Sequence, residues 1–297
     1  MFNWLSRFFR GRRSDATREQ GAGTPPAPAA EPRARAPRPQ ARFGDVNSMP
    51  LRIESDARTH QGRVRKLNED SFFAHESSGL WAVADGMGGH EHGEWASAKL
   101  VEVLGALTLP DSFDSACAAI ADGVRAANSA VFVESQKRGK QMGSTIVAMF
   151  VRGSRYAIFW VGDSRAYQLR RHKLERLSRD HSQVQEMVDR GLLDPKDAIG
   201  HPMGHVLARA VGVRPDVEVD MVEGTIEPGD SFLLCSDGLH GTVDEAEIAR
   251  MLGRGSPQEA SGELVDRTLE RGAPDNVTVI AISVSEPTLL NLPSEAA

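Results

Sequence analysis

Residues 145–161, TIVAMFVRGSRYAIFWV, hold two apolar runs on either side of the short polar segment Arg152-Gly153-Ser154. β-Branched and aromatic residues dominate both runs, and such residues favour strands. A connection this short joins strands that run antiparallel. The stretch therefore predicts a hairpin with strands at Thr145–Val151 and Arg155–Val161.

More strands and several helices are predicted around this hairpin. A second hairpin is predicted where Ala166–Arg170 returns as Leu174–Leu177. Apolar runs bounded by turn residues predict further strands at Leu80–Ala84, Ser231–Cys235 and Val277–Val284. Apolar residues spaced three and four apart predict helices at Gly93–Leu107, Phe113–Lys137, Ser182–Arg190, Asp244–Leu252 and Pro257–Arg271. Long helices combined with antiparallel hairpins indicate a layered α+β fold rather than a doubly wound parallel sheet.

The composition is that of an ordinary globular protein. Of the 297 residues, 40% are hydrophobic and 26% charged, and only two are cysteines. These fractions exclude a wholly disordered chain, a collagen-like repeat and a disulfide scaffold. The chain has no run of about 18 apolar residues, which argues against a membrane-spanning helix. Two distant cysteines and no recognisable secretory signal favour a cytoplasmic location.

Charge divides the chain into a basic N-terminal part and an acidic remainder. Residues 1–45 carry nine Arg against four Asp and Glu, a net charge of +5. Residues 46–297 carry 26 Lys and Arg against 37 Asp and Glu, a net charge of −11. The acidic part has no dense Lys/Arg stripe, so we expect no nucleic acid among the partners.

The N-terminal part is predicted to be a tail. Residues 21–41 are rich in Ala, Pro and Arg and cannot offset their ordering entropy by burial. We therefore predict a disordered basic tail and linker over 1–45, a folded body over 46–287 and a short C-terminal tail over 288–297. The aromatic and Arg-rich segment Met1–Arg13 has two interpretations: a helix lying on the inner membrane face or in a partner's groove, or a frayed terminus.

Acidic residues recur at the ends of the predicted strands. They are Asp85, Asp163, Asp237, Asp275 and the pair Glu69-Asp70. A single Asp at such a place is usually a turn former, but the recurrence indicates carboxylates that converge. Converging carboxylates repel one another unless a cation lies among them, and hard oxygen ligands favour Mg²⁺ or Mn²⁺. The pattern therefore predicts a metal site suited to phosphoryl chemistry.

Seven short blocks, which include these acidic residues, follow one another in a characteristic order. They are Arg65–Asp70, Asp85–His90, Gly143–Thr145, Val161–Tyr167, Ser178–Ser182, Leu234–Leu239 and Asp275–Thr278. The series resembles the bacterial branch of the metal-dependent type-2C (PPM) serine/threonine protein phosphatases. The resemblance extends from about Ser55 to Ser285. One block alone would be weak, whereas seven in order are specific.

The resemblance implies a four-layer α-β-β-α sandwich in which two central antiparallel sheets are flanked by helix pairs. It also implies a centre of two Mn²⁺ or Mg²⁺ ions at one end of the sandwich, and the folded body would then be the catalytic domain. By the same resemblance, Asp85 bridges the two ions. Asp237 and Asp275 complete the first, and the Gly86 carbonyl contacts the second.

Further residues receive roles from the same resemblance. Asp163 serves, with Asp237, a third metal site found in many bacterial members. Glu69 and Asp70 hold metal-bound waters. Arg65 binds the substrate phosphate, as suits a planar guanidinium that can hold two oxygens. His90 is a candidate for protonating the leaving group, with capping of the following helix as the alternative.

These implications identify the chain as an enzyme, a phosphoprotein phosphatase specific for phosphoserine and phosphothreonine. We expect direct hydrolysis by a hydroxide that bridges two metal ions, without a phosphoenzyme. We expect phosphorylated proteins as substrates, a bacterial Ser/Thr kinase as the opposing partner, and a monomer. One alternative is a phosphatase of an anti-sigma-factor-antagonist type regulator, and another is an inactive phosphoprotein-binding module. Residues between His181 and Val213 form either a flap beside the metals or a connecting loop.

Overall fold

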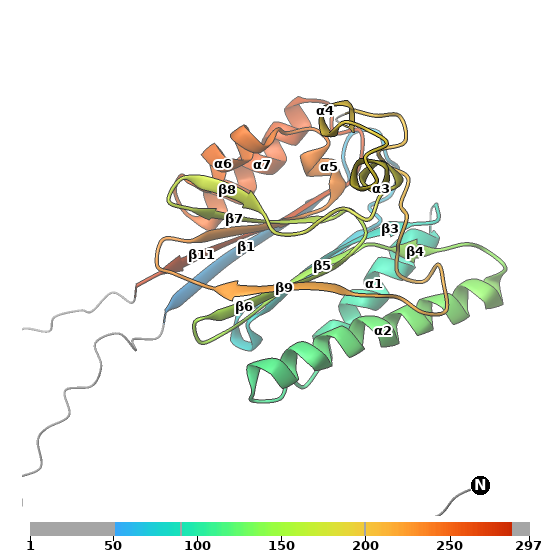
Figure 1. Cartoon of the computed structure of the whole chain (residues 1–297), viewed down its shortest axis with the longest axis horizontal. Helices are drawn as coiled ribbons and strands as arrows, with labels where there is room; N and C mark the ends of the chain where they lie inside the picture. Colours follow the sequence, from blue (N-terminus) through green and yellow to red (C-terminus); the bar gives the residue numbers. More distant parts are fainter. Residues whose placement is uncertain (1–50, 90, 199, 287–297) are drawn as a thin grey trace, which may run out of the picture. The chain divides into compact units, whose positions relative to one another are not determined.

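Two antiparallel sheets form the centre of the protein (Figure 1) in the computed structural model, which describes residues 51–286 except 90 and 199. The first sheet has the order β1-β11-β10-β7-β8. Its strands are β1 (Arg52–His60), β7 (Arg165–Arg170), β8 (Lys173–Arg176), β10 (Ser231–Cys235) and β11 (Val277–Ser285). The second sheet has the order β2-β3-β5-β6-β9, and β4 pairs with β3. Its strands are β2 (Asp70–His75), β3 (Leu80–Met87), β4 (Gly143–Ser144), β5 (Ile146–Arg152), β6 (Arg155–Val161) and β9 (Asp220–Thr225).

The predicted hairpin at the centre of the second sheet is confirmed. β5 and β6 pair from Ile146 opposite Val161 to Arg152 opposite Arg155. Gly153 in the turn has a φ of 62°, in the left-handed region that glycine adopts without strain. The short turn therefore sets the register of the two most buried strands.

The central strands β3, β5 and β6 of the second sheet bury both of their faces. On β3, Trp81 and Val83 pack between the two sheets, against Phe232 of the first sheet among others. Ala82 and Ala84 of the same strand face the opposite side and pack in a separate core with the helices. Because side chains alternate along a strand, two cores require an apolar residue at nearly every position, which explains the continuous apolar runs.

Helix pairs cover the outer faces of both sheets. The second sheet is covered by α1 (Glu91–Gly105) and α2 (Phe113–Arg138), and the first by α6 (Glu245–Leu252) and α7 (Pro257–Glu270). α7 begins with a capping box, in which the Ser256 side chain accepts from the Glu259 N–H and the Glu259 side chain accepts from the Ser256 N–H. The expected α+β four-layer sandwich is confirmed.

α2 is long and apolar enough to span a membrane, which the sequence expectation did not anticipate. No other helix in the described part of the chain meets that test. One face of α2 is buried, and residues such as Ile120 and Val124 pack against the second sheet. We therefore interpret α2 as a helix that belongs to the protein core.

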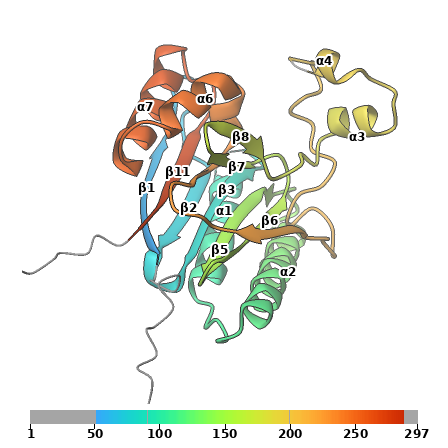
Figure 2. The same cartoon turned by 60° about the vertical axis from the view of Figure 1, so that its left-hand side comes forward.

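The segment between β8 and β9 lies outside the layers. It contains the short helices α3 (Gln183–Asp189) and α4 (Pro195–Ala198), which stand apart from the two sheets (Figure 2). The Ser182 side chain caps α3 by accepting from the Gln185 N–H at 3.2 Å. We call residues 182–206 the flap segment.

Most predicted elements agree with the structure to within a few residues. Four strands were missed: β1, β2 and β9, each of which lies at the edge of its sheet, and the two-residue strand β4. The predicted tails 1–45 and 288–297, and the domain limits at 46 and 287, lie outside the described residues and stay predictions. The same holds for His90.

Candidate metal centre

Two aspartates lie opposite each other at the end of the second sheet. Asp70 is the first residue of β2 and Asp85 lies near the end of β3, and the two are Cα partners in the antiparallel ladder. The Asp85 N–H donates to Thr145 Oγ1 at 3.1 Å, and its carbonyl accepts from Ser144 Oγ at 2.9 Å. The Thr145 N–H also donates to this carbonyl, at 2.8 Å. The sequence block Gly143–Thr145 thus holds the backbone of Asp85.

The Asp70 carboxylate connects the two sheets. Its Oδ2 accepts from Ser236 Oγ at 2.8 Å and from Thr278 Oγ1 at 2.7 Å, both at the end of the first sheet. Its Oδ1 is buried and has no hydrogen-bond partner among the described residues. A buried carboxylate oxygen without a partner is costly, so this atom has the chemistry of a cation or water ligand.

Asp237 lies directly after β10, as the first residue of the short helix α5 (Asp237–His240). Its carboxylate is close enough to Asp85 for its charge to raise the pKa of Asp85. A Cβ at the next residue, Gly238, would lie 1.9 Å from the Asn276 carbonyl oxygen. Only glycine fits there, and this close approach brings α5 against the loop that carries Asp275.

Asn276 organises the loop that carries Arg65. Its Nδ2 donates to the carbonyls of Gln61 and Leu67, both at 2.8 Å, and its Oδ1 accepts from the Glu69 N–H at 2.8 Å. Arg65 Nη2 lies 2.6 Å from Asp275 Oδ2. The sequence pair Asp275-Asn276 therefore holds the 61–69 loop beside the other acidic residues.

Asp163 lies in the turn between β6 and β7 and is buried. Its carbonyl accepts from His240 Nε2 at 3.0 Å. The preceding residue, Gly162, donates its N–H to His181 Nδ1 at 3.1 Å and accepts from the His181 N–H at 2.8 Å. His181 Nε2 therefore carries the proton and faces Asp220 Oδ2 at 3.2 Å.

The five aspartates form one electrostatic cluster. The pKa of Asp85 is raised well above its usual range because the carboxyl is desolvated and because Asp70, Asp237, Asp163 and Asp275 all repel its charge. Desolvation, with repulsion from Asp237, raises the pKa of Asp70 to about 7 and that of Asp163 to about 8. We refer to these five residues as the carboxylate cluster.

Two basic side chains supply positive charge to the cluster. His205 Nδ1 lies 3.6 Å from Asp237 Oδ2, and this negatively charged neighbour raises the pKa of His205. Burial alone would raise the pKa of Asp237 and is the largest single effect, but His205, His240 and Asp85 together outweigh it and the net shift is downward. The hydrogen bond to Asp275 likewise raises the pKa of Arg65.

The oxygen atoms of the carboxylate cluster are suited to bind hard divalent cations. All its side-chain donors are carboxylate oxygens, one of them buried without a partner, and the mutual repulsion would be relieved by a bound cation. A Cβ at Gly86 would lie 2.1 Å from the Gly93 carbonyl oxygen, so the chain beside Asp85 packs as only glycine allows. In the part of the chain that the structure describes, no three His, Cys, Asp or Glu side chains form a closed ligand set. The fit therefore rests on donor chemistry and charge.

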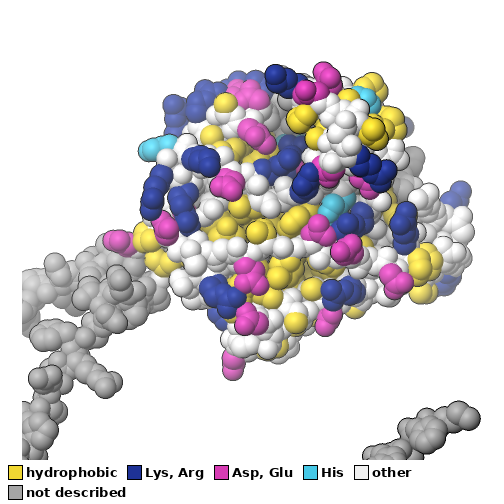
Figure 3. Space-filling view, viewed as in Figure 1, with side chains coloured by type: hydrophobic (Ala, Val, Ile, Leu, Met, Phe, Trp, Pro, Cys, Tyr) yellow, Lys and Arg dark blue, Asp and Glu magenta, His cyan; other side chains and the backbone are white. Residues whose placement is uncertain are grey.

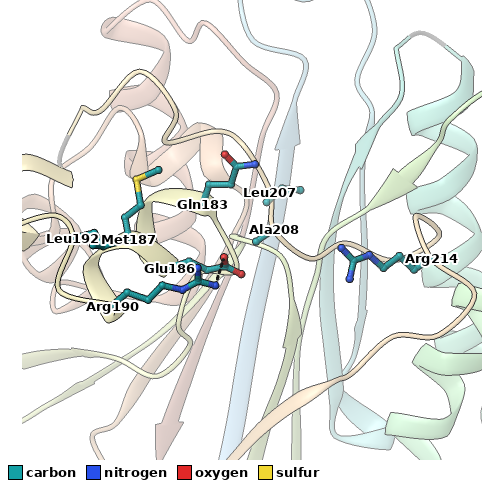
Figure 4. A pocket seen from close by; sticks show the side chains of 8 residues that line it. All are labelled: Gln183, Glu186, Met187, Arg190, Leu192, Leu207, Ala208 and Arg214. Atoms are coloured by element: carbon teal, nitrogen blue, oxygen red, sulfur yellow. Dashed lines mark ion pairs between the residues drawn. The ribbon is translucent and has the colours of Figure 1, made fainter.

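The flap segment reaches the cluster through His205. A cavity of about 460 Å³ lies between α3 and the chain that returns from the flap segment (Figure 4). Its lining includes Leu207, Arg214 and the ion pair of Arg190 with Glu186, whose Nη2 and Oε2 are 3.5 Å apart. The segment thus lies beside the carboxylate cluster, where a flap is expected, and its role as a flap stays a prediction.

The structure brings together every described residue that the sequence predicted for the site. It also shows contacts that the sequence did not predict. The hydroxyls of Ser236 and Thr278 donate to the Asp70 carboxylate, the His240 ring donates to the Asp163 carbonyl, and His205 lies beside the Asp237 carboxylate. Ser236 and His240 flank Asp237 closely in the chain, which could have indicated them. Thr278 belongs to the predicted block Asp275–Thr278 but received no role there, and nothing in the sequence indicated His205.

Residues 59–272 match the family Protein phosphatase 2C. The chain is 37% identical over 230 residues to the serine/threonine protein phosphatase PstP of Mycobacterium tuberculosis. The aligned region covers 77% of this chain and 44% of PstP. It thus spans less than half the length of that curated relative.

Solved structures agree with this match. PppA of Pseudomonas aeruginosa, described as a key regulatory component of T6SS, superimposes with a TM-score of 0.74 at 40% identity. That likeness covers 78% of this chain and 97% of PppA. The catalytic domain of PstP in complex with two manganese ions superimposes with a TM-score of 0.72 at 34% identity, over 80% of this chain and all of that domain.

Proposed function

Because the chain belongs to the protein phosphatase 2C family, we propose that it is a serine/threonine protein phosphatase that uses two Mn²⁺ or Mg²⁺ ions. Its substrates are proteins phosphorylated on serine or threonine by a bacterial kinase, which it opposes. One observation carries the proposal: five aspartates from five separate stretches of sequence converge beside an exposed arginine.

The metal ions would be held by the carboxylate cluster. Asp85, whose charge is repelled by the other four aspartates, would hold the ions together with Asp237, Asp275 and the Gly86 carbonyl. Asp163 would serve a third ion together with Asp237. Asp70 and Glu69 would hold metal-bound waters. When bound, the ions supply an activated water and neutralise the negative charge of the phosphate.

Arg65 would bind and orient the phosphate. Its side chain is 51% exposed, and Nη2 is the atom that lies next to Asp275. A guanidinium has five N–H donors, so others remain available for phosphate oxygens. Two parallel hydrogen bonds to one phosphate would fix the direction from which water attacks.

The reaction is a direct hydrolysis. Water adds to phosphorus, the bond from phosphorus to the serine or threonine oxygen breaks, and that oxygen takes up a proton. The products are the free hydroxyl side chain and inorganic phosphate. His90 stays a candidate donor of the proton, and it lies outside the described residues.

A phosphothreonine peptide tests the proposal. We expect the protein to release phosphate in Mn²⁺ and to stop when EDTA removes the metal. Asp237→Asn should lower the rate at least about 100-fold, because a metal-holding carboxylate is lost. Asp111→Asn, at an exposed position, is the matched control and should keep the wild-type rate. Full activity in EDTA, or in Asp237→Asn, would contradict the proposal, as would a burst of phosphate from a phosphoenzyme.

A further inference from the structure

The loop between β1 and β2 carries an exposed and strongly basic sequence. Residues 63–67 read Arg-Val-Arg-Lys-Leu, and all five are exposed. Val64 is 69% exposed and Leu67 38%. The loop holds three positive charges and no negative one, within a body whose net charge is −11. We call residues 63–67 the basic loop.

The backbone of the basic loop is fixed at several points. Asn276 Nδ2 holds the carbonyls of Gln61 and Leu67 on either side of it. The Arg63 N–H donates to the Ala273 carbonyl at 2.9 Å, and Gln61 Nε2 donates to the Arg65 carbonyl at 2.8 Å. The loop is therefore held in place while its side chains extend into solvent.

The loop also lies directly against the carboxylate cluster. A Cβ at Gly62 would lie 2.2 Å from the Asp275 carbonyl oxygen, and Gly62 has a φ of 80°. Arg65, in the middle of the loop, contacts Asp275 through its side chain. Any substrate that places its phosphate at Arg65 therefore passes next to the other residues of the loop.

Two of the three cationic side chains of the basic loop have no ion-pair partner among the described residues. Arg65 pairs with Asp275, whereas Arg63 and Lys66 form no ion pair with any residue between 51 and 286 that the structure describes. Consecutive Cα atoms are about 3.8 Å apart, so the Cα atoms of Arg63 and Lys66 lie within about 8 Å of that of Arg65. Elsewhere, on the face drawn in Figure 3, cationic and anionic side chains intermingle across the described residues.

We propose that Arg63 and Lys66 select substrates that carry acidic side chains next to the phosphorylated residue. This inference rests on the proposed function and concerns the same site. An extended peptide advances about 3.3 Å per residue, so the first two residues on either side of the phosphorylated one come within reach of both cations. A negative side chain there gains an attraction that a neutral one lacks.

The expected size of the preference for acidic peptides follows from the exposure of Arg63 and Lys66. An exposed ion pair contributes a modest free energy, which corresponds to a factor of about two to five in affinity. Two such pairs predict about a fivefold preference in kcat/KM for an acidic peptide. The preference should fall to nearly one at about 0.5 M salt, because ions screen exposed charges at such distances.

Two phosphothreonine peptides test the inference. They are identical except that the two residues on each side of the phosphothreonine are Glu in one and Gln in the other. The quantity measured is the ratio of their kcat/KM values in Mn²⁺ for one protein, which cancels any change in that protein's overall activity. We expect a ratio of about five for the wild type and about one for Arg63→Gln/Lys66→Gln. Arg63→Glu/Lys66→Glu should turn the preference toward a peptide flanked by Lys.

Arg254→Gln is the matched control, because Arg254 is also exposed and unpaired among the described residues but follows α6. It should keep the wild-type ratio. A wild-type ratio near one, or a ratio of five that survives in Arg63→Gln/Lys66→Gln, would overturn the inference and leave the proposed function intact. If the wild type hydrolysed neither peptide, the proposed function would fail and the inference with it.

Discussion

The carboxylate cluster predicts an unusual dependence of stability on pH when no metal is present. In EDTA, the folded protein should become less stable as the pH rises from about 7 to about 8. The responsible groups are Asp70 and Asp163, both buried, whose pKa values are raised to about 7 and about 8. The perturbation that isolates the effect is Asp163→Asn, because an amide does not titrate.

The sign follows from proton binding. A carboxyl in the unfolded chain has a pKa near 4 and is ionised throughout this range. Since the folded pKa values are higher, the folded state holds more protons than the unfolded state, and stability falls as the pH rises. Between about pH 7 and about pH 8, Asp163 accounts for about 1 kcal/mol and Asp70 for a few tenths more. Burial also raises the pKa of Cys117 and of Cys235, but these thiols change the dependence of stability on pH only at higher pH.

The assay is urea unfolding followed by tryptophan fluorescence at several pH values in EDTA. The wild type should lose about 1.4 kcal/mol of unfolding free energy over this range, and Asp163→Asn should lose only the few tenths that Asp70 contributes. In saturating Mn²⁺ the unfolding free energy should instead increase with pH, because metal binding releases protons and tightens as the pH rises.

The result that refutes this reasoning is a wild-type stability that is constant or rises with pH in EDTA. An equal slope in wild type and Asp163→Asn would count against it as well. Either outcome would mean that these carboxyls are already ionised in the folded protein, and that they do not form one mutually repelling cluster.

Two further predictions concern single side chains. Arg65→Ala should lower kcat/KM for a phosphopeptide about 100-fold, since a charged, bidentate contact to phosphate is lost, whereas Arg254→Gln should leave steady-state kinetics unchanged. Asn128→Ala should destabilise the fold by about 3 kcal/mol in urea unfolding, because Asn128 is buried and holds Gly212 and the carbonyl of Pro215. Ser129→Ala, at the exposed neighbouring position, should stay within about 0.5 kcal/mol of wild type.

Central strands could be predicted from the sequence and edge strands could not. β5 and β6 are buried on both faces, so their sequences are apolar throughout and easy to interpret. β1, with the sequence RIESDARTH, lies at an edge, and its inward residues Ile53 and Ala57 alternate with charged ones. An edge strand needs only one apolar face, and charges on the other face oppose unwanted pairing with other chains. Such a strand resembles a polar loop.

The acidic residues of the site were predictable, whereas much of what holds them was not. The aspartates stand beside apolar runs and glycines that can be found in the sequence. The Asp70 carboxylate, by contrast, is held by Ser236 and Thr278, which are 166 and 208 residues away in the chain. Contacts over such separations depend on how the two sheets pack, and no local pattern encodes them.

The cluster therefore depends on the packing of one sheet on the other. Asp85 and Asp70 belong to the second sheet, whereas Asp237 and Asp275 lie at the ends of strands in the first. Between them lies the core that includes Trp81. A carboxylate cluster divided in this way gains metal affinity only if the sheets hold their separation. Side chains in that core would thus determine how closely the two halves of the site approach.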